Sequence, residues 1–146
     1  MYRHILIPTD GSELSEKAIT HGVALAKTHG AKITAVHVTA PFHVSALDPI
    51  TVAQSAAEQH LQRARTLASQ HLRAVAEAAE AVDVACNTVH AVDDHPHRAI
   101  INTAKSKGCD LIAMASHGRR GVSAIVLGSE TVKVLTHTSI PVLVLR

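Results

Sequence analysis

Apolar residues along the chain follow two alternating patterns. Short runs rich in β-branched residues are bounded by Gly, Pro, Asp or Thr, and several are apolar throughout, which is typical of strands covered on both faces. We expect strands at residues 4–7, 33–38, 82–89, 111–115 and 142–145. Between these runs, apolar residues recur every three or four positions, as they do in amphipathic helices. We expect helices at residues 12–29, 57–79, 97–107 and 129–137.

Strict alternation of strands and helices predicts an α/β fold, in which a parallel sheet carries helices on both faces and right-handed crossovers join the strands. In such sheets, ligands bind beyond the carboxyl ends of the strands, near the point where the strand order reverses. The loops expected at that edge span residues 8–12, 38–49, 90–96 and 116–128.

Length and composition narrow the class of protein. The chain has 146 residues, of which 47% are hydrophobic and 18% charged, and its net charge is +2. We therefore expect one domain spanning residues 1–146. Tyr2 and Phe42 are its only aromatic residues. Because single-stranded nucleic acids are bound on stacked aromatic side chains, we do not expect a nucleic-acid partner.

The chain also lacks the patterns of exported and membrane proteins. No run approaches the roughly 20 apolar residues of a membrane span, and the first apolar run, residues 5–7, is shorter than that of a signal peptide. Cys86 and Cys109 have no metal-binding or redox spacing and are expected to be small apolar core residues. We expect a cytoplasmic protein with no membrane partner.

The segment that follows the fourth expected strand carries the most distinctive chemistry. It contains Gly118, Arg119, Arg120 and Gly121, and Gly128-Ser129 precedes the last expected helix. Glycines allow a ligand to approach the backbone, and free amides at the start of a helix bind anions. A phosphate-binding loop is one interpretation. The other is that Gly128-Ser129 is a turn and an N-cap and that the arginines are merely solvated. The segment is neither a Walker loop nor a GxGxxG motif.

Four segments in this order resemble the universal stress protein family, and the resemblance covers the whole chain. They are residues 5–12 (ILIPTDGS), 37–38 (HV), 110–118 (DLIAMASHG) and 141–145 (PVLVL). The resemblance implies a three-layer α/β/α fold with a five-stranded parallel sheet. That fold is Rossmann-like, of the adenine nucleotide alpha hydrolase type, with strand order 3-2-1-4-5.

ATP-binding members of that family carry the motif Gly-x2-Gly-x9-Gly-Ser/Thr. Gly118, Gly128 and Ser129 match it, and Ala115 stands at the first glycine. The resemblance implies a protein of the stress response that binds ATP or a related adenine nucleotide as a regulatory ligand, with Mg²⁺ at the phosphates. The site residues it implies are Pro8, Thr9, Asp10, Val38, Ala115, His117, Gly118, Arg119, Arg120, Gly121, Gly128, Ser129, Glu130 and Thr131. The alternative, suggested by Ala115, is a dimeric interaction module that does not bind nucleotide.

Two of these residues have an ordinary structural interpretation as well. Asp10 is implied to accept hydrogen bonds from ribose hydroxyls, but Asp10-x-x-Glu13 also has the spacing of a capping box. Val38 is implied to contact adenine, but it also fits an ordinary core position. Because Phe42 is the only ring expected nearby, we expect aliphatic walls and backbone groups to hold the adenine.

The chain has twelve histidines, and neither a metal site nor a catalytic site is expected from them. His95-Pro96-His97 is the closest pair, but zinc sites need three or four protein ligands and Pro96 suits the start of a helix. We therefore expect surface histidines. Ser116, His117 and Asp10 form a triad only if adjacent Ser and His side chains meet, which we do not expect, and no Gly-x-Ser-x-Gly elbow is present. We expect no catalytic residues and no enzyme, although slow ATP hydrolysis is compatible with the site; a true hydrolase would lose turnover when Asp10 or Ser129 is changed.

The last expected strand, from Val142 to Leu145, is entirely apolar. Soluble proteins normally protect an apolar strand at the edge of a sheet, and pairing with the same strand of a second copy about a two-fold axis would do so. Members of the family commonly dimerise through this strand. We expect a homodimer.

Overall fold

The computed structural model describes residues 1–118 and 127–146. Strands and helices alternate along it in the expected order. The elements are β1 (His4–Pro8), α1 (Glu13–His29), β2 (Lys32–Thr39), α2 (Ile50–Glu80), β3 (Cys86–Val92), α3 (Pro96–Lys107), β4 (Leu111–Ala115), α4 (Ser129–His137) and β5 (Val142–Leu145).

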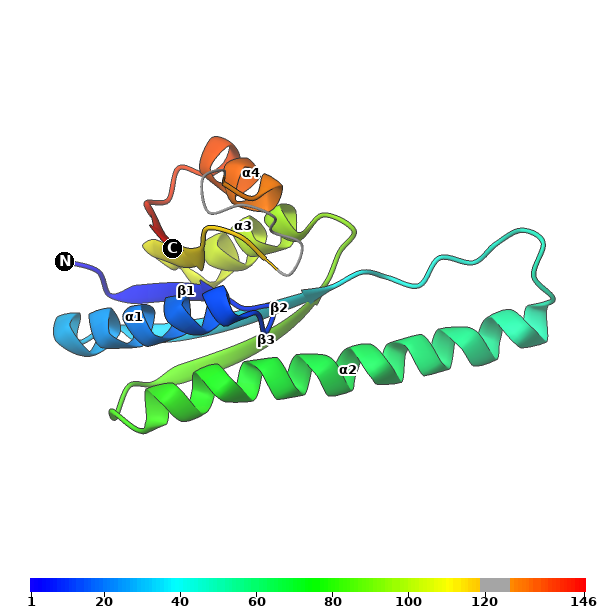
Figure 1. Ribbon diagram of the computed structural model, residues 1–146, viewed down its shortest axis with the longest axis horizontal. Helices are drawn as coiled ribbons and strands as arrows, with labels where there is room; N and C mark the ends of the chain where they lie inside the picture. Colours follow the sequence, from blue (N-terminus) through cyan, green and yellow to red (C-terminus); the bar gives the residue numbers. More distant parts are fainter. Residues whose placement is uncertain (119–126) are drawn as a thin grey trace.

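The strands form one parallel sheet in the order β3-β2-β1-β4-β5, which confirms the predicted fold class and strand order. Helices α1 and α2 cover one face, and α3 and α4 cover the other (Figure 1). Strands β2 and β3 lie on one side of β1, whereas β4 and β5, which come later in the chain, lie on its other side. The order therefore reverses between β1 and β4.

Each face of the sheet has its own apolar core. Alternate side chains of β1 and β2, such as Ile5, Ile7 and Ile33, pack against α1 and α2, whereas Leu6 and Val36 point to α3 and α4. The central strands are buried along both faces, as their continuous apolar runs predict.

Local signals explain where two of the helices, α1 and α3, begin and end. The Ser12 hydroxyl caps α1 by accepting a hydrogen bond from the Ser15 amide, and Gly30, at φ +65°, ends the helix. Pro96 opens α3, as predicted, and Gly108, at φ +68°, closes it. Asp10 is not the cap of α1, so the capping-box interpretation was wrong.

Helix α2 begins at Ile50 rather than at residue 57, and its apolar stripe is shorter than predicted. Leu61 is 43% exposed. The reason is visible in Figure 1: residues 40–49 lead away from β2, and the first half of α2 lies beyond the end of the sheet before the helix returns to it. Periodicity identifies a helix by its buried stripe, and this half has almost none.

The third strand also differs from its predicted bounds, because it begins at Cys86 instead of residue 82. Val82 and Asp83 form the turn after α2, in which Asp83 adopts φ +57°. Val84 is buried there against the α1/α2 core, so an apolar turn was mistaken for the start of a strand. Both cysteines are free; Cys109 is buried as expected and Cys86 is half-buried. Within the described ranges, no helix combines the length and apolar character needed to cross a bilayer.

Candidate functional site

A pocket of about 570 Å³ opens at the carboxyl edge of the sheet, next to the point between β1 and β4 where the strand order reverses. Every predicted site residue that the structure describes lines it. These residues are Pro8, Thr9, Asp10, Val38, Ala115, His117, Gly118, Gly128, Ser129, Glu130 and Thr131. The remaining three, Arg119, Arg120 and Gly121, lie outside the described residues.

Sequence reasoning missed part of the lining. The additional residues are Ser15, Val36, Ala40, Asp93, Asp94, Pro96, Ile100 and Met114. The loop at residues 90–96 was expected at this edge, and that signal could have identified Asp93, Asp94 and Pro96. Val36 and Met114 lie near the carboxyl ends of their strands, where the same rule applies.

Hydrogen bonds from the backbone and the side chain of Thr9 fix the loop between β1 and α1. The Thr9 amide donates to the carbonyl of Val36 at 2.9 Å. The Thr9 hydroxyl contacts Ser15 Oγ at 3.2 Å and accepts from the Gly11 amide at 3.3 Å. Asp10 follows, and its Oδ1 accepts from the Ser12 amide at 3.0 Å. These bonds hold the Asp10 carboxylate at the pocket wall.

The other carboxylate oxygen of Asp10 faces Gly118, on the loop after β4. A Cβ atom added to Gly118 would lie 2.7 Å from Asp10 Oδ2. A side chain at position 118 would have to displace the Asp10 carboxylate, and this contact explains in physical terms why a glycine suits the position.

Hydrogen bonds connect the start of α4 to the end of β4. The Gly128 amide donates to the Ser116 carbonyl at 2.8 Å, and the Thr131 hydroxyl donates to the carbonyls of Ala115 and Ser116, at 3.1 Å each. Gly128 is the N-cap and supplies no side-chain cap. Ser129, Glu130 and Thr131, the first residues of α4, line the pocket, and the start of a helix without a side-chain cap is suited to bind anions.

Ser116 and His117 meet, contrary to expectation. Ser116 Oγ lies 3.0 Å from His117 Nδ1. Ser116 is only 2% exposed and is absent from the pocket lining, whereas His117 lines the pocket. The hydroxyl thus fixes the orientation of the imidazole rather than facing a ligand itself.

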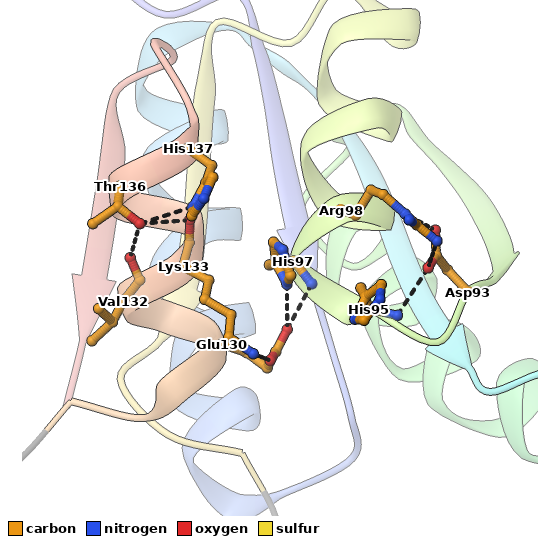
Figure 2. A network of polar contacts seen from close by, with 9 residues as sticks. All are labelled: Asp93, His95, His97, Arg98, Glu130, Val132, Lys133, Thr136 and His137. Atoms are coloured by element: carbon orange, nitrogen blue, oxygen red, sulfur yellow. Dashed lines mark hydrogen bonds and ion pairs between the residues drawn. The ribbon is translucent and has the colours of Figure 1, made fainter.

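A polar network ties α3 to α4 at the pocket rim (Figure 2). Glu130 Oε2 accepts from the amide and Nδ1 of His97, at 2.8 and 3.0 Å, and Oε1 accepts from Lys133 Nζ at 2.9 Å. Burial raises the pKa of Glu130, but the hydrogen bonds from Lys133 and His97 together outweigh it, so the pKa lies below its usual value. Glu130 is therefore an anion at neutral pH that joins the first turns of two helices.

Asp93 forms the second part of the network shown in Figure 2. Arg98 donates to its two oxygens at 2.9 and 2.6 Å, and the His95 amide donates at 2.8 Å. The hydrogen bonds from Arg98 and His95 lower the pKa of Asp93 to about 2. This pairing fixes the loop between β3 and α3 where it borders the pocket.

The histidines and the single phenylalanine differ from expectation. His4, His37 and His117 are buried, so not all twelve histidines lie at the surface. Among the described residues, no cluster of three or more His, Cys, Asp or Glu side chains is placed to hold a metal ion. Phe42 packs against His60, with ring centroids 5.6 Å apart, and does not line the pocket.

Ala115, the residue that departs from the nucleotide motif, ends β4 in extended conformation. Asp83 is the only non-glycine residue with positive φ in the described part of the chain, so the methyl group at position 115 causes no backbone strain.

Comparison with known proteins agrees with this architecture. The model of the universal stress protein family matches residues 1–146. The universal stress protein YxiE of Bacillus subtilis is 32% identical over 149 residues, and the match covers all of both chains. The solved structure of MJ0577, a universal stress protein of Methanocaldococcus jannaschii, superposes with a TM-score of 0.77 at 28% identity, covering 99% of this chain and 96% of that one.

Two structures of lower identity share the fold. One is a universal stress protein in complex with cAMP, with a TM-score of 0.70 at 19% identity, covering 99% of this chain and 97% of that one. The other, from Archaeoglobus fulgidus, is in complex with dAMP and has a TM-score of 0.66 at 16% identity, covering 99% and 98%. Motifs, strand order and full-length matches lead to the same conclusion: the chain belongs to the universal stress protein family.

Proposed function

We propose that this protein binds an adenine nucleotide, with ATP as the leading candidate, as a regulatory ligand in the pocket between β1 and β4. The convergence of eleven predicted residues from three separate segments of the chain on one pocket carries the proposal. The volume of about 570 Å³ suits a ligand of nucleotide size. The cAMP and dAMP complexes of two proteins with the same fold support this ligand class.

The chemistry of the lining divides the pocket into two parts. Val36, Val38 and Ile100 give one part an aliphatic wall suited to a base. Gly118, Gly128 and Ser129 give the other part close backbone access, a hydroxyl group and the amides of α4, which suit phosphates. Asp10 lies beside this second part and is suited to accept hydrogen bonds from ribose hydroxyls.

Positive charge and Mg²⁺ complete the proposed complex. Arg119 and Arg120 follow Gly118 directly in the sequence and would counter the charge of the phosphates. Mg²⁺ is usually bound through substrate phosphates and water rather than by an all-protein cage. The pocket therefore fits the ion: the phosphates, water and the Ser129 hydroxyl would be its ligands, and the ion would neutralise phosphate charge.

Gly128→Asp tests the proposal directly. A Cβ atom added at residue 128 would lie 3.1 Å from the Ser116 carbonyl oxygen, so the new side chain would be crowded, and its charge would repel phosphate. Calorimetric titration with Mg·ATP, AMP and cAMP should show binding to the wild type and none to the variant. Gly30→Asp is the matched control, because it adds the same group at the opposite edge of the sheet, where nothing lies within 4 Å of the new Cβ.

The competing hypothesis, a dimeric interaction module that does not bind nucleotide, gives the opposite result. In that case the wild type shows no heat with any of the three nucleotides, and heat denaturation of the purified protein releases none that mass spectrometry can detect. The relaxed backbone at Ala115 supports nucleotide binding over this alternative.

A further inference from the structure

The pocket lining contains four acidic side chains, those of Asp10, Asp93, Asp94 and Glu130. Asp93 and Glu130 each accept hydrogen bonds from the protein through both of their oxygens. Asp10 lies beside the part of the pocket that suits phosphates, with one oxygen facing Gly118. Asp94 differs from these three, because a contact within the protein accounts for only one of its oxygens.

Asp94 lies at the end of the pocket that β2 and β3 form. The Asp93 amide donates to the Thr39 carbonyl at 3.0 Å, and this bond continues the pairing of the two strands to the pocket edge. The next residue of each segment, Asp94 and Ala40, lines the pocket. In the sheet order, these strand ends lie on the opposite side of β1 from β4, which leads into the part that suits phosphates. Asp94 therefore belongs to the aliphatic part of the pocket, which suits a base.

One oxygen of Asp94 is held by the segment that follows β2. His43 Nε2 lies 2.7 Å from Asp94 Oδ1. Because a carboxylate only accepts, His43 Nε2 carries the proton of this bond. The segment is in turn attached to α2: His60 Nε2 donates to the Ala40 carbonyl at 2.9 Å, and its ring packs against Phe42, with centroids 5.6 Å apart. These contacts restrict the position of the carboxylate at the pocket wall.

The second oxygen of Asp94 makes no hydrogen bond within the described part of the chain. The side chain is 45% exposed, so this oxygen can be reached by a ligand. An oxygen that only accepts needs a donor from the ligand. The donors of a nucleotide are the ribose hydroxyls and the exocyclic amino group of the base. Because Asp94 lies in the aliphatic part of the pocket, the amino group is the donor that fits.

We propose that Asp94 selects a base with an exocyclic amino group: Asp94 Oδ2 accepts a hydrogen bond from that group, while His43 holds the carboxylate in position. The inference rests on the proposed function and deepens it, because it names the residue that recognises the base. Adenine carries its amino group on C6, and unsubstituted purine has no donor there. A site built to accept a hydrogen bond from a ligand discriminates against the analogue that lacks the donor.

Calorimetric titration with Mg·ATP and with the magnesium complex of purine riboside triphosphate tests this selection, because the two nucleotides differ only in the amino group. A hydrogen bond to a charged group corresponds to about tenfold in affinity or more, so the wild type should prefer Mg·ATP by about tenfold. Asp94→Ala removes the acceptor and should bind both nucleotides with equal affinity. Asp48→Ala is the matched control: Asp48 is exposed, lies in residues 40–49 and is outside the pocket lining, so the preference should remain.

Two variants of His43 test its positioning role. His43→Ala retains the carboxylate but removes the donor that holds it, and should lower the preference for Mg·ATP without abolishing it. His43→Gln supplies an amide nitrogen that can donate to Asp94 and should restore the preference. The ratio of the two affinities is informative because a general loosening of the segment would weaken binding of both nucleotides equally.

The outcomes separate this inference from the proposed function. A wild type that binds Mg·ATP but shows no preference overturns the selection by Asp94 and leaves the proposed function standing. A ratio that is unchanged in Asp94→Ala also overturns the selection, since the carboxylate would then act on a part that both nucleotides share. An unchanged ratio in His43→Ala overturns the positioning role of His43. A wild type that binds neither nucleotide contradicts the proposed function and, with it, the selection.

Discussion

Gly118 shows how a single atom can set the geometry of the pocket. Asp10 Oδ2 occupies the space in which a Cβ atom of residue 118 would lie. We predict that Gly118→Ala displaces the Asp10 carboxylate and weakens binding of Mg·ATP. The loss of a hydrogen bond to a charged group costs about 1.5–3 kcal/mol, which corresponds to roughly tenfold or more in affinity, and calorimetric titration measures it.

The control for this substitution is Gly30→Ala. A Cβ atom there meets nothing within 4 Å, but the residue has φ +65°. That change should lower stability by about 1–2 kcal/mol through backbone strain and leave the affinity for nucleotide unchanged. Unaltered binding in Gly118→Ala would contradict the role assigned to Asp10.

His4 illustrates how a buried polar side chain makes stability depend on pH. It is 5% exposed, its Nε2 lies 2.8 Å from Thr34 Oγ1, and burial, followed by the charge of Lys32, lowers its pKa. As pH falls below the ordinary histidine pKa of about 6.5, the unfolded chain takes up a proton that the folded protein resists. The free energy of unfolding therefore decreases.

We predict that this acid-induced loss of stability is smaller in His4→Gln. Urea denaturation at several pH values between about 7.5 and about 5 measures it. His21→Gln, in which an exposed histidine is changed, should retain the slope of the wild type. An identical pH dependence in His4→Gln and wild type would show that His4 does not contribute.

Individual side-chain contacts were the least predictable part of the site. The resemblance to the family implied Asp10, Gly118 and Gly128 as site residues, and all three line the pocket. Their contacts could not be predicted, because Asp10 and Gly118 lie close together in space but belong to two loops that are distant in the sequence. The Ser116–His117 contact was predicted wrongly, since adjacent side chains meet only when the local backbone turns them to the same side.

At the scale of elements, Glu130 connects α3 to α4. It accepts two hydrogen bonds from His97 and one from Lys133 (Figure 2). We predict that Glu130→Ala lowers the free energy of unfolding by about 1–3 kcal/mol, because it leaves the partly buried His97 amide without its acceptor. Lys133→Ala is the control: it removes one exposed ion pair and should cost about 0.5 kcal/mol.

Chemical denaturation measures both changes. A cost for Glu130→Ala no greater than that for Lys133→Ala would show that the contact between the helices is not stabilising. Since the first turns of α3 and α4 both border the pocket, we also expect weaker nucleotide binding in Glu130→Ala than in Lys133→Ala.

The predictability of each element depended on how completely it is buried. β4, α4 and β5 have the bounds that their apolar patterns predict, because β4 is fully buried and the other two are bounded by Gly128 and Pro141. The start of α2 was missed because that half of the helix lies beyond the sheet (Figure 1). The start of β3 was misplaced because Val84 is buried without belonging to a strand.

At the scale of the whole molecule, the sheet has two edges of different character. β3 carries the polar residues Asn87, Thr88 and His90, whereas β5 consists of Val and Leu alone. In the described part of the chain, β5 pairs only with β4, and Leu143 is 37% exposed. On the adjacent helix α4, Val132 and Leu135 are also exposed. An apolar edge of this kind is normally protected, so β5 is the edge at which we expect a second copy to bind.

We predict a homodimer in which β5 strands from two copies pair about a two-fold axis. Leu143→Lys would place a charge at this contact, and light scattering at micromolar concentration should then give the mass of one chain, 15.4 kDa, instead of twice that value. Val92→Lys makes the same change at an exposed valine on the opposite edge strand and should leave the dimer intact. A monomeric wild type contradicts the dimer itself, whereas a Leu143→Lys variant that remains dimeric contradicts its location at β5. Because Leu143 does not line the pocket, nucleotide affinity measured on the monomeric variant also shows whether one copy suffices for binding.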